Sequence, residues 1–260
     1  MKKKVAMVQM DVTYGDPKVN FHFVGKWVMD AVQSGADIIV LPELWDTGYD
    51  LKRFDELADK DLKATIEFLS DLAQQYHVAI VGGSAAELSG ESMKNTMIII
   101  DEDGNLVHTY SKLHLFQLMD EHVHLTGGED YPDFELAETD SAGFICYDIR
   151  FPEWMRKSAV NGTKVMYVVA QWPKQRIDHW RTLLQARAIE NQCYVVACNR
   201  VGSDPKNEFG GQSMVIDPWG DIVTDGGPNE KIVLADIDTA NVDNVRDQIP
   251  IFQDRRAEWY

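Results

Sequence analysis

The sequence is poor in cysteine and in basic side chains, and both shortages narrow its function. The three cysteines among 260 residues, Cys146, Cys193 and Cys198, form no CxxC pair. This excludes a disulfide framework and indicates reduced thiols, as in a cytoplasmic protein. Lysine and arginine number 25 against 42 aspartates and glutamates, which gives a formal net charge of −17. Such a chain lacks the basic face that binds phosphate backbones, so we expect no nucleic-acid partner.

Long apolar runs are missing as well. No stretch approaches the roughly 20 apolar residues that a membrane-spanning helix needs, so we expect no membrane partner. Residues 1–16 contain three lysines near their start but reach Asp11 before any apolar segment of useful length. This is not the pattern of a secretory signal. The sequence therefore predicts a cytoplasmic protein.

The residues that are present have the composition of an ordinary globular protein, 45% hydrophobic and without a linker or low-complexity segment. We therefore expect a single domain over residues 1–260. Short apolar runs rich in β-branched residues recur and predict strands that are buried on both faces. These runs lie at 4–10, 36–43, 78–84, 96–100, 142–147, 164–170, 193–199, 213–217 and 231–237.

Helical patterns at 18–34, 61–76 and 178–192 lie between these runs, and this alternation indicates an α/β domain. Two stretches, 95–110 and 212–227, each read as strand, tight glycine turn and strand, and each follows a β-α-β stretch. The chain therefore predicts two similar halves. If each sheet carried helices on one face and packed on the other sheet, the result would be a four-layer α-β-β-α sandwich with pseudo-symmetric halves.

Cys146 stands where an apolar run ends, and Pro152 is well placed for the first turn of a following helix. A side chain at such a corner points into the crevice where α/β folds bind ligands. The backbone N–H of Tyr147 would be free to face an oxyanion there. Cys146 is therefore a candidate nucleophile, with a small buried hydrophobe as the alternative. For Cys193 and Cys198 we expect the buried, unreactive role.

A nucleophilic thiol needs a base, and no histidine has a context that pairs it with Cys146. Three histidines cluster with acidic neighbours, but their spacing does not match a zinc motif on one helix face, so we expect no metal. A metal-dependent hydrolase built on this cluster is the competing enzyme class. The cluster consists of His114, His122 and His124.

A carboxylate can replace imidazole as the base. Glu43 follows a buried run and Pro42, where burial would raise its pKa toward that of a general base, although a loop glutamate is the alternative. Lys112 follows the second strand of a predicted hairpin. It could be a solvated charge at the sheet edge, or a fixed cation that stabilises a thiolate or an oxyanion.

The motifs LPELWDTGY, YSKLHLF and GFICYDIRFPEW, around Glu43, Lys112 and Cys146, resemble in this order the nitrilase superfamily, the carbon-nitrogen hydrolases. Residues 179–195 and 210–223 match as well, so the resemblance spans nearly the whole chain. It implies an α-β-β-α sandwich, usually dimerised through one helical layer, and a Glu-Lys-Cys triad. We accordingly expect a homodimer or higher homo-oligomer and no cofactor.

Carried over by motif, the resemblance makes Cys146 the nucleophile and Glu43 the general base. Lys112 would then hold the oxyanion together with the Tyr147 N–H. A second glutamate often follows the lysine motif in this family. Glu121 is the best match to it, although an aspartate precedes it directly.

The segments CYDIRFPEW and KLHLFQLMDEHVHL look most like the omega-amidase branch, including a bacterial member associated with methionine salvage. That branch hydrolyses the side-chain amide of 2-oxo acids such as 2-oxoglutaramate and 2-oxosuccinamate. We therefore expect a thiol-dependent amidohydrolase that acts on a small amide. The alternatives are a nitrilase, an N-carbamoyl amino acid hydrolase, an aliphatic amidase or a non-catalytic binding member.

An anionic 2-oxo acid needs a cation in this otherwise acidic protein. For Arg150 we expect pairing with Glu153 or another carboxylate, and contact with the substrate is the alternative. The candidates for a substrate pocket are Gln171, Trp172, Lys174, Arg176 and Arg150.

The aromatic tail at 249–260 carries Phe252, Trp259 and Tyr260. It could fold back on its own subunit or dock on a neighbour.

Overall fold

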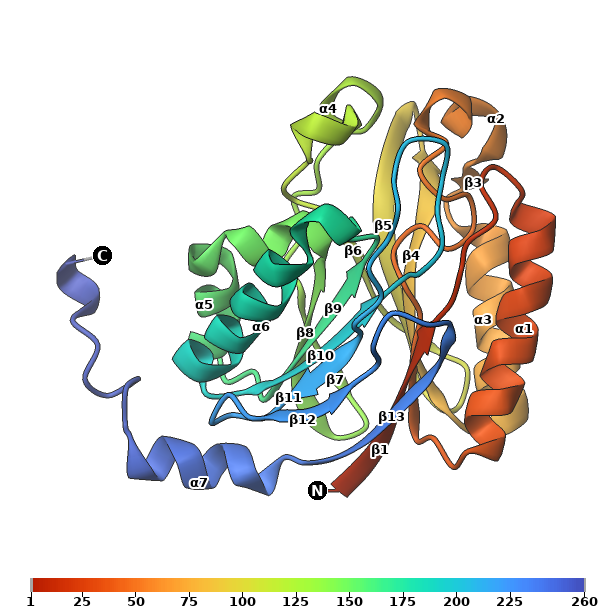
Figure 1. The fold of residues 1–260 in the computed structure, drawn as a ribbon. Coiled ribbons are helices and arrows are strands. Elements are labelled where there is room, and N and C mark those ends of the chain that lie inside the picture. The colour runs from red at the N-terminus through yellow and green to blue at the C-terminus, as the bar shows by residue number, and fades with distance from the viewer. Residues whose placement is uncertain (1, 260) are drawn as a thin grey trace.

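The computed structural model describes residues 2–259, which form two mixed β-sheets packed face to face and flanked by helices (Figure 1). In spatial order, the first sheet contains β13 (Lys231–Asp238), β1 (Lys2–Gln9), β2 (Ile38–Val40), β4 (Ala79–Ser89), β5 (Ser92–Ile100) and β6 (Leu106–Ser111), with β3 (Asp59–Lys60) beside β4. The second contains β12 (Ile222–Asp225), β11 (Met214–Ile216), β10 (Tyr194–Asn199), β9 (Val165–Ala170), β8 (Thr139–Ile145) and β7 (Asp133–Leu136).

The two sheets repeat one topology, which confirms the prediction of two similar halves. In the first sheet β1, β2 and β4 run parallel, and the antiparallel hairpin β5–β6 follows. In the second sheet β8, β9 and β10 run parallel, and the antiparallel strands β11 and β12 follow. One further antiparallel strand borders each half, because β13 pairs with β1 and β7 pairs with β8.

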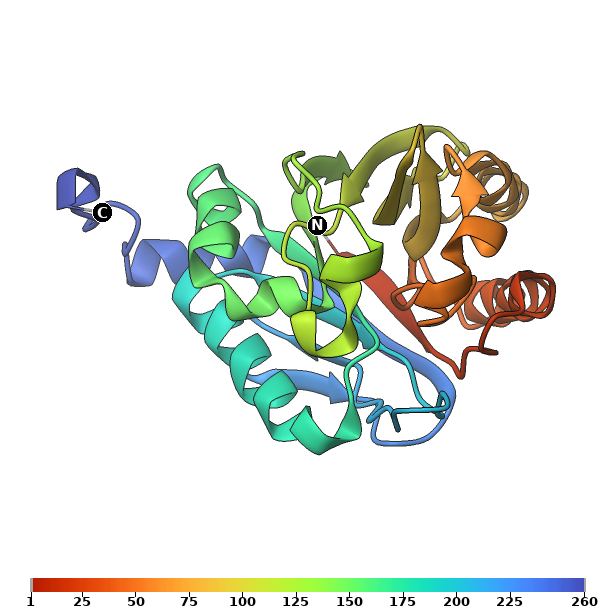
Figure 2. The ribbon, with the colours of Figure 1, turned by 90° about the horizontal axis from the view of Figure 1, so that it is seen from above.

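Helices cover the outer face of each sheet, so the predicted four-layer sandwich is confirmed. Figure 2 shows α1 (Pro17–Gln33) and α3 (Lys63–Tyr76) on one side, with α5 (Pro152–Val160) and α6 (Ile177–Asn191) on the other. Alternate residues of β1 face different layers. Val5 and Met7 join the core shared with the second sheet, whereas Ala6 and Val8 pack under α1 and α3.

Helix α1 shows how the local sequence sets an element boundary. Asp16 is its N-cap, and the Asp16 side chain accepts a hydrogen bond from the backbone N–H of Val19 at 3.2 Å. Pro17 occupies the first turn, where its missing N–H costs nothing. The three predicted helices are found within one or two residues of their expected bounds. Two short helices, α2 (Phe54–Leu57) and α4 (Glu121–His124), lie in the loops above the sheets.

The chain ends in α7 (Ala240–Gln248) and a tail that projects away from the body of the molecule (Figure 1). Phe252 packs against the shared core, and the guanidinium groups of Arg156 and Arg246 lie over its ring. The side chain of Trp259 is 74% exposed. The tail therefore folds back on its own subunit as far as Phe252 and stands clear beyond it. Tyr260 lies outside the described residues.

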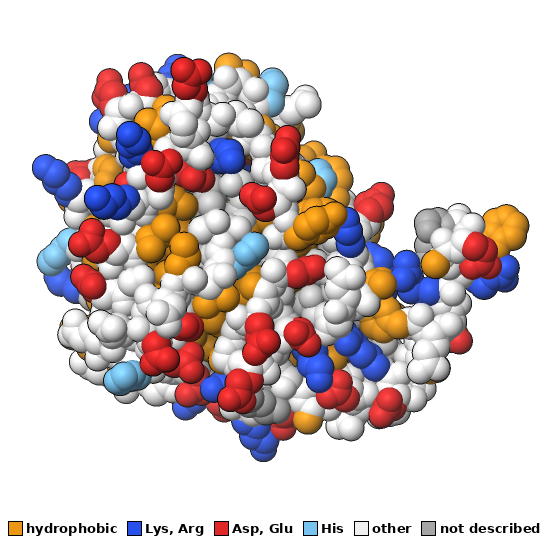
Figure 3. Space-filling view, turned by 180° about the vertical axis from the view of Figure 1, so that it is seen from behind, with side chains coloured by type: hydrophobic (Ala, Val, Ile, Leu, Met, Phe, Trp, Pro, Cys, Tyr) orange, Lys and Arg blue, Asp and Glu red, His pale blue; other side chains and the backbone are white. Residues whose placement is uncertain are grey.

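The surface reflects the acidic composition. On the face shown in Figure 3, Asp and Glu side chains are spread among fewer Lys and Arg side chains, with apolar side chains in small groups between them. Within residues 2–259, none of the helices combines the length and the apolarity that a membrane span would need.

Candidate active site

The loop after β2 carries Glu43, whose carboxylate reaches the segment that follows β9 of the second sheet. The loop is anchored to β4, since Ser84 donates its N–H to the carbonyl of Pro42 and accepts the N–H of Leu44 on its hydroxyl. Gly83 has a φ of +59°, and a Cβ there would lie 2.0 Å from the carbonyl oxygen of Pro42. Only glycine therefore allows this close approach, which fixes the position of Glu43.

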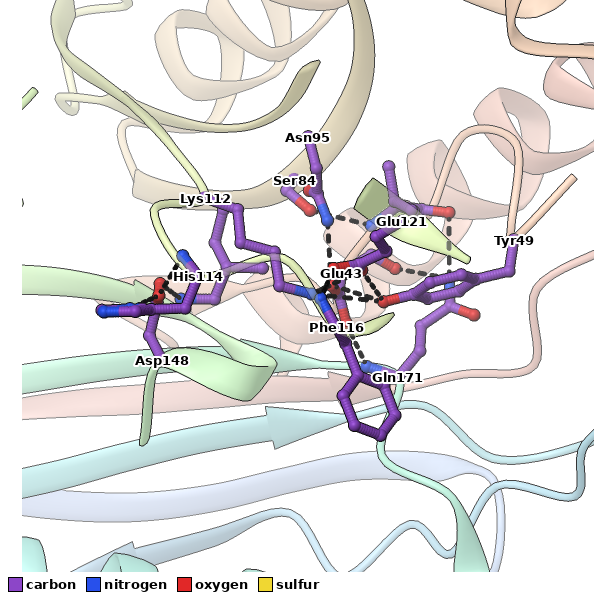
Figure 4. Close-up of polar contacts among 12 residues, drawn as sticks. Glu43, Tyr49, Ser84, Asn95, Lys112, His114, Phe116, Glu121, Asp148 and Gln171 are labelled. Atoms are coloured by element: carbon purple, nitrogen blue, oxygen red, sulfur yellow. Dashed lines mark hydrogen bonds and ion pairs between the residues drawn. The ribbon is translucent and has the colours of Figure 1, made fainter. Parts of the chain in front are cut away.

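Both carboxylate oxygens of Glu43 are fully engaged, and its side chain is buried (Figure 4). Oε1 accepts hydrogen bonds from the Lys112 ammonium at 2.8 Å, the Tyr49 hydroxyl at 2.8 Å and the Asn95 amide at 2.9 Å. Oε2 accepts the backbone N–H of Gln171 at 2.8 Å. Because Gln171 follows β9 of the second sheet, this carboxylate bridges the two halves of the fold.

Lys112 follows β6 and extends its ammonium between two carboxylates. Nζ donates to Oε1 of Glu43 at 2.8 Å and to Oε1 of Glu121 at 2.6 Å, and all three side chains are fully buried. The Tyr49 hydroxyl lies 2.7 Å from Oε1 of Glu121 as well as 2.8 Å from Oε1 of Glu43, so its one proton is shared between the two carboxylates. The structure thus brings Glu121 into the cluster predicted from the motif. The neighbouring Asp120 is on the surface, 4.0 Å from the ammonium of Lys206.

Burial and charge act in opposite directions in this cluster. Burial alone would lower the pKa of Lys112, but the negative charges of Glu121 and Glu43 outweigh it, so the pKa is raised and the ammonium stays charged. Burial raises the pKa of Glu121, and the Lys112 cation opposes this rise. Burial also raises the pKa of Tyr49, with the charges of Glu121 and Glu43 acting in the same direction. Tyr49 therefore takes part as a neutral donor.

Cys146 sits at the predicted corner. Strand β8 ends at Ile145, a 3₁₀ turn spans Cys146–Arg150, and α5 begins at Pro152. The φ of Cys146 is +46°, a left-handed conformation that costs a residue with a Cβ about 1–3 kcal/mol. Tyr147 is in the first turn, whose N–H groups have no partner within the turn itself. The sharp corner lifts the thiol off the sheet, as a strand-to-helix elbow does.

Asp148 holds this corner in place. Its buried carboxylate accepts the backbone N–H of Ile145 at 3.0 Å and the Tyr110 hydroxyl at 2.9 Å. The other oxygen accepts the backbone N–H of His114 at 3.1 Å and contacts the His114 ring at 2.8 Å (Figure 4). Hydrogen bonds from the end of β8 and from the segment that contains Tyr110 and His114 thus offset the strain at Cys146.

The Cys146 thiol lies within the field of the buried cluster. Burial raises its pKa well above the ordinary value, and the charge of Glu43 together with a hydrogen bond to Glu43 raises it further, against the opposing charge of Lys112. The resting thiol is therefore protonated. A reaction at this sulfur needs a base at the moment of attack, and Glu43 is the carboxylate whose charge acts most strongly on the thiol.

A small pocket opens beside the thiol. Its walls include Trp172, Arg150 and Arg176, three of the residues expected there from the sequence. The expected pairing of Arg150 with Glu153 or another carboxylate is wrong for residues 2–259, in which the Arg150 guanidinium contacts the His179 ring at 3.2 Å. The reason is local, because Arg150 ends the 3₁₀ turn while Glu153 is in the first turn of α5. The two residues therefore do not share a helix face.

Two other pocket candidates lie elsewhere. Gln171 is buried, and its side-chain amide donates to the backbone carbonyls of Glu43 at 2.7 Å and Leu44 at 3.2 Å. It supports the Glu43 loop and does not line the pocket. Lys174 is exposed and pairs with Glu208 at 2.6 Å on the surface.

Sequence reasoning missed several supporting residues. Tyr49 touches both glutamates and lies six residues after Glu43 in the same motif, so its position was the available signal. Asn95 donates to Glu43 from the first strand of the predicted hairpin, and nothing in the sequence marks it. Buried Arg200 donates to the side-chain oxygen of Gln171 at 3.0 Å and pairs with Asp11 at 2.6 Å. Arg200 thereby fixes the side chain of Gln171, which in turn binds the carboxylate and the loop of Glu43.

The histidine cluster does not assemble. His114 stacks on Phe151 with ring centroids 3.7 Å apart and bonds Asp148. In the part of the chain that the structure describes, no group of three or more His, Cys, Asp and Glu side chains could hold a metal ion. Cys193 and Cys198 are fully buried in the core, as expected.

Comparison with known proteins agrees with this architecture. The carbon-nitrogen hydrolase family model matches residues 4–247. The chain is 47% identical to the 2-oxoglutaramate amidase of Bacillus subtilis (strain 168), over 260 residues and all of both chains. It is 33% identical over 254 residues to the omega-amidase YafV of Escherichia coli (strain K12), covering 96% of each.

The crystal structure of Saccharomyces cerevisiae Nit3, a member of branch 10 of the nitrilase superfamily, superimposes with a TM-score of 0.91. The two proteins share 30% sequence identity, and the match covers 98% of this chain and 97% of Nit3. With the repeated sheets, the buried cluster of two glutamates and a lysine, and the cysteine at its corner, these matches lead to one conclusion: the chain belongs to the carbon-nitrogen hydrolase family, within the nitrilase superfamily.

Proposed function

We propose that this protein is an omega-amidase that hydrolyses the terminal amide of a 2-oxo acid such as 2-oxoglutaramate and releases ammonia. The observation that carries the proposal is the buried ion pair of Glu43 and Lys112. The charges of this pair act on the protonated thiol of Cys146, which stands at a strained corner of the backbone. The relatives named above support the substrate class, because the 47% identical protein is a 2-oxoglutaramate amidase.

In the first half of the reaction, Glu43 accepts the Cys146 proton as the sulfur attacks the amide carbon. Charge then develops on the carbonyl oxygen. Lys112 donates to Glu43 at 2.8 Å and to Glu121 at 2.6 Å, whereas its contact with the Tyr49 hydroxyl is long, at 3.4 Å. The N–H in this weak contact can turn to the oxyanion. The Tyr147 N–H is the second donor. The C–N bond breaks as protonated Glu43 returns its proton to the nitrogen, and ammonia leaves a Cys146 thioester.

In the second half, water attacks the thioester carbon and Glu43 accepts the water proton. The same two donors, Lys112 and the Tyr147 N–H, stabilise the second oxyanion. The C–S bond then breaks, the acid is released, and Glu43 returns the proton to the sulfur. Each turnover thus converts one amide and one water into one acid and one ammonia.

Glu121 keeps the ammonium of Lys112 charged and aimed. Without Glu121, only Glu43 would counter the penalty of burying the Lys112 cation, and the base itself would be tied more tightly to it. The two carboxylates therefore have different roles. Glu43 transfers protons, and Glu121 holds the Lys112 cation in place.

A panel of substrates tests the proposal. Ammonia release is measured with 2-oxoglutaramate, 2-oxosuccinamate, an aliphatic amide, a nitrile and an N-carbamoyl amino acid. We expect the highest kcat/KM with the 2-oxo acid amides and no release by the Cys146→Ala variant. Turnover of the carbamoyl compound or the nitrile without turnover of 2-oxoglutaramate would reject the substrate class and favour one of those activities instead.

We also propose that the protein is a homodimer. An apolar groove lies between the start of α5, the end of α6, the turn between β11 and β12, and the chain around the end of α7. Along it, the side chains of Ile189, Trp219 and Ile249 are about half exposed. A second copy of this chain would bury these side chains. Light scattering of the purified protein gives the mass in solution, and a monomer at micromolar concentration would contradict the proposal.

A further inference from the structure

Two arginines reach the thiol pocket from different loops. Arg150 ends the 3₁₀ turn that begins at Cys146, and Arg176 ends the 3₁₀ turn Lys174–Arg176 that follows β9. Both line the same small pocket as the Cys146 thiol. Two arginines therefore line the pocket of the reacting sulfur in a protein whose formal net charge is −17.

Aromatic rings hold both guanidinium groups. The Arg150 guanidinium carbon lies 4.8 Å from the centre of the Trp172 ring, and that of Arg176 lies 5.3 Å from the centre of the Phe116 ring. Within residues 2–259, no carboxylate forms an ion pair with either arginine. One nitrogen of Arg150 also contacts the His179 ring at 3.2 Å. A guanidinium that rests on a ring keeps its remaining edge N–H donors for a planar anion.

We propose that Arg150 and Arg176 form a clamp for the carboxylate and the adjacent 2-oxo oxygen of the substrate, while its far end presents the amide to Cys146. This inference rests on the proposed function and names the residues that select the substrate class. The clamp makes the enzyme specific for anionic amides, since a neutral amide would bring no negative charge to the two cations. Lys174, two residues before Arg176, takes no part because it pairs with Glu208 on the surface.

Three variants test the clamp. Arg176→Met removes a charge, Arg150→Lys keeps the charge but loses the planar fork, and Lys174→Met is the matched control from the same turn as Arg176. The assay measures kcat/KM for 2-oxoglutaramate and for the neutral amide butyramide. We expect Arg176→Met to lower kcat/KM for 2-oxoglutaramate by about 10- to 100-fold, the value of a charge-assisted hydrogen bond.

Arg176→Met should change kcat/KM for butyramide by less than about threefold. For Arg150→Lys, we expect a kcat/KM for 2-oxoglutaramate that lies between the values of Arg176→Met and wild type. Lys174→Met should match wild type with both substrates. Equal losses on both substrates, or an unchanged preference in Arg176→Met and Arg150→Lys, would overturn the clamp.

A binding experiment separates this inference from the proposed function. In the Cys146→Ala background, the dissociation constant of 2-oxoglutarate is measured by calorimetry with and without Arg176→Met. We expect about 10-fold weaker binding with Arg176→Met and no change with Lys174→Met. If wild type hydrolyses 2-oxoglutaramate but binding is the same in all backgrounds, the clamp is wrong and the proposed function stands. If wild type hydrolyses only butyramide, the proposed substrate class is wrong, and the binding result still decides the clamp.

Discussion

Replacing Lys112 by methionine removes the ammonium that lies between the buried carboxylates of Glu43 and Glu121 and should expose their repulsion. The change deletes hydrogen bonds of 2.8 Å to Glu43 and 2.6 Å to Glu121, whose side chains are both fully buried. Hydrogen bonds to charged groups contribute about 1.5–3 kcal/mol each, and breaking a buried ion pair costs about 3–5 kcal/mol. We therefore expect Lys112→Met to lower the free energy of unfolding by about 4 kcal/mol at pH 8.

The loss of stability in Lys112→Met should become smaller at acidic pH, because a protonated carboxyl group no longer repels its neighbour. Burial already raises the pKa of Glu121 in the folded protein, and without the cation it rises further. A carboxyl group whose pKa is raised by folding binds its proton more tightly in the folded protein than in the unfolded chain. Its protonation therefore stabilises the folded protein as the pH falls through the folded-state pKa. Between pH 8 and pH 5 we therefore expect the difference from wild type to fall to about half.

Urea unfolding followed by tryptophan fluorescence measures this difference at each pH. The double variant Lys112→Met/Glu121→Gln, which leaves a single carboxylate, should recover much of the stability at pH 8. A loss that is the same at pH 5 and pH 8, or a double variant no more stable than the single one, would refute the reasoning.

Three further changes test the support of the site. Tyr49→Phe removes the hydroxyl that both glutamates share, so urea unfolding should show a loss of about 1–3 kcal/mol, and an unchanged midpoint would contradict that role. Arg200→Met frees Gln171, so kcat for 2-oxoglutaramate should fall about 5- to 10-fold with KM nearly constant, whereas a rise in KM alone would argue against a positioning role. Burial raises the pKa of Asp46 to about 7, so wild type should lose as much as about 4 kcal/mol as pH rises from about 4 to 7. Asp46→Asn should remove this dependence of stability on pH. An unchanged pH profile in Asp46→Asn would show that Asp46 is not the group responsible.

Much of the fold follows from local pattern. Continuous β-branched runs predicted strands buried on both faces, and the six buried residues of β9 are an example. The repeat of hairpin turns predicted two halves, and the pairing order of the two sheets confirms it. Strands β7 and β12 are short and partly exposed, so their sequences carry no comparable apolar signal, although the second hairpin predicted β12.

The site residues also include some that the sequence could predict and some features that it could not. Glu43, Lys112 and Cys146 each follow a strand, and strand ends are where α/β folds gather reactive groups, so sequence could nominate them. What sequence could not give is the direction of a side chain after the strand. Gln171 follows β9 directly, yet it turns beneath the Glu43 loop, whereas the next residue, Trp172, lines the pocket.

Residues that act across the sheets are the hardest to predict. Arg200 reaches Gln171 and Asp11 only because the two halves pack face to face, a contact between positions 189 residues apart in the case of Asp11. Arg150 was expected to pair locally, but the turn that strains Cys146 also rotates Arg150 into the pocket. In both cases tertiary packing overrides the local pattern.

The central claim is that Cys146 carries the acyl group and that Glu43 moves the protons. The most direct test is mass spectrometry of the Glu43→Gln variant after acid quenching of a reaction with 2-oxoglutaramate. We expect a slowly formed thioester on the peptide that contains Cys146, with none on peptides that contain Cys193 or Cys198 and none in Cys146→Ala. An acyl group on another residue, or ammonia release that persists in Cys146→Ala, would contradict the claim.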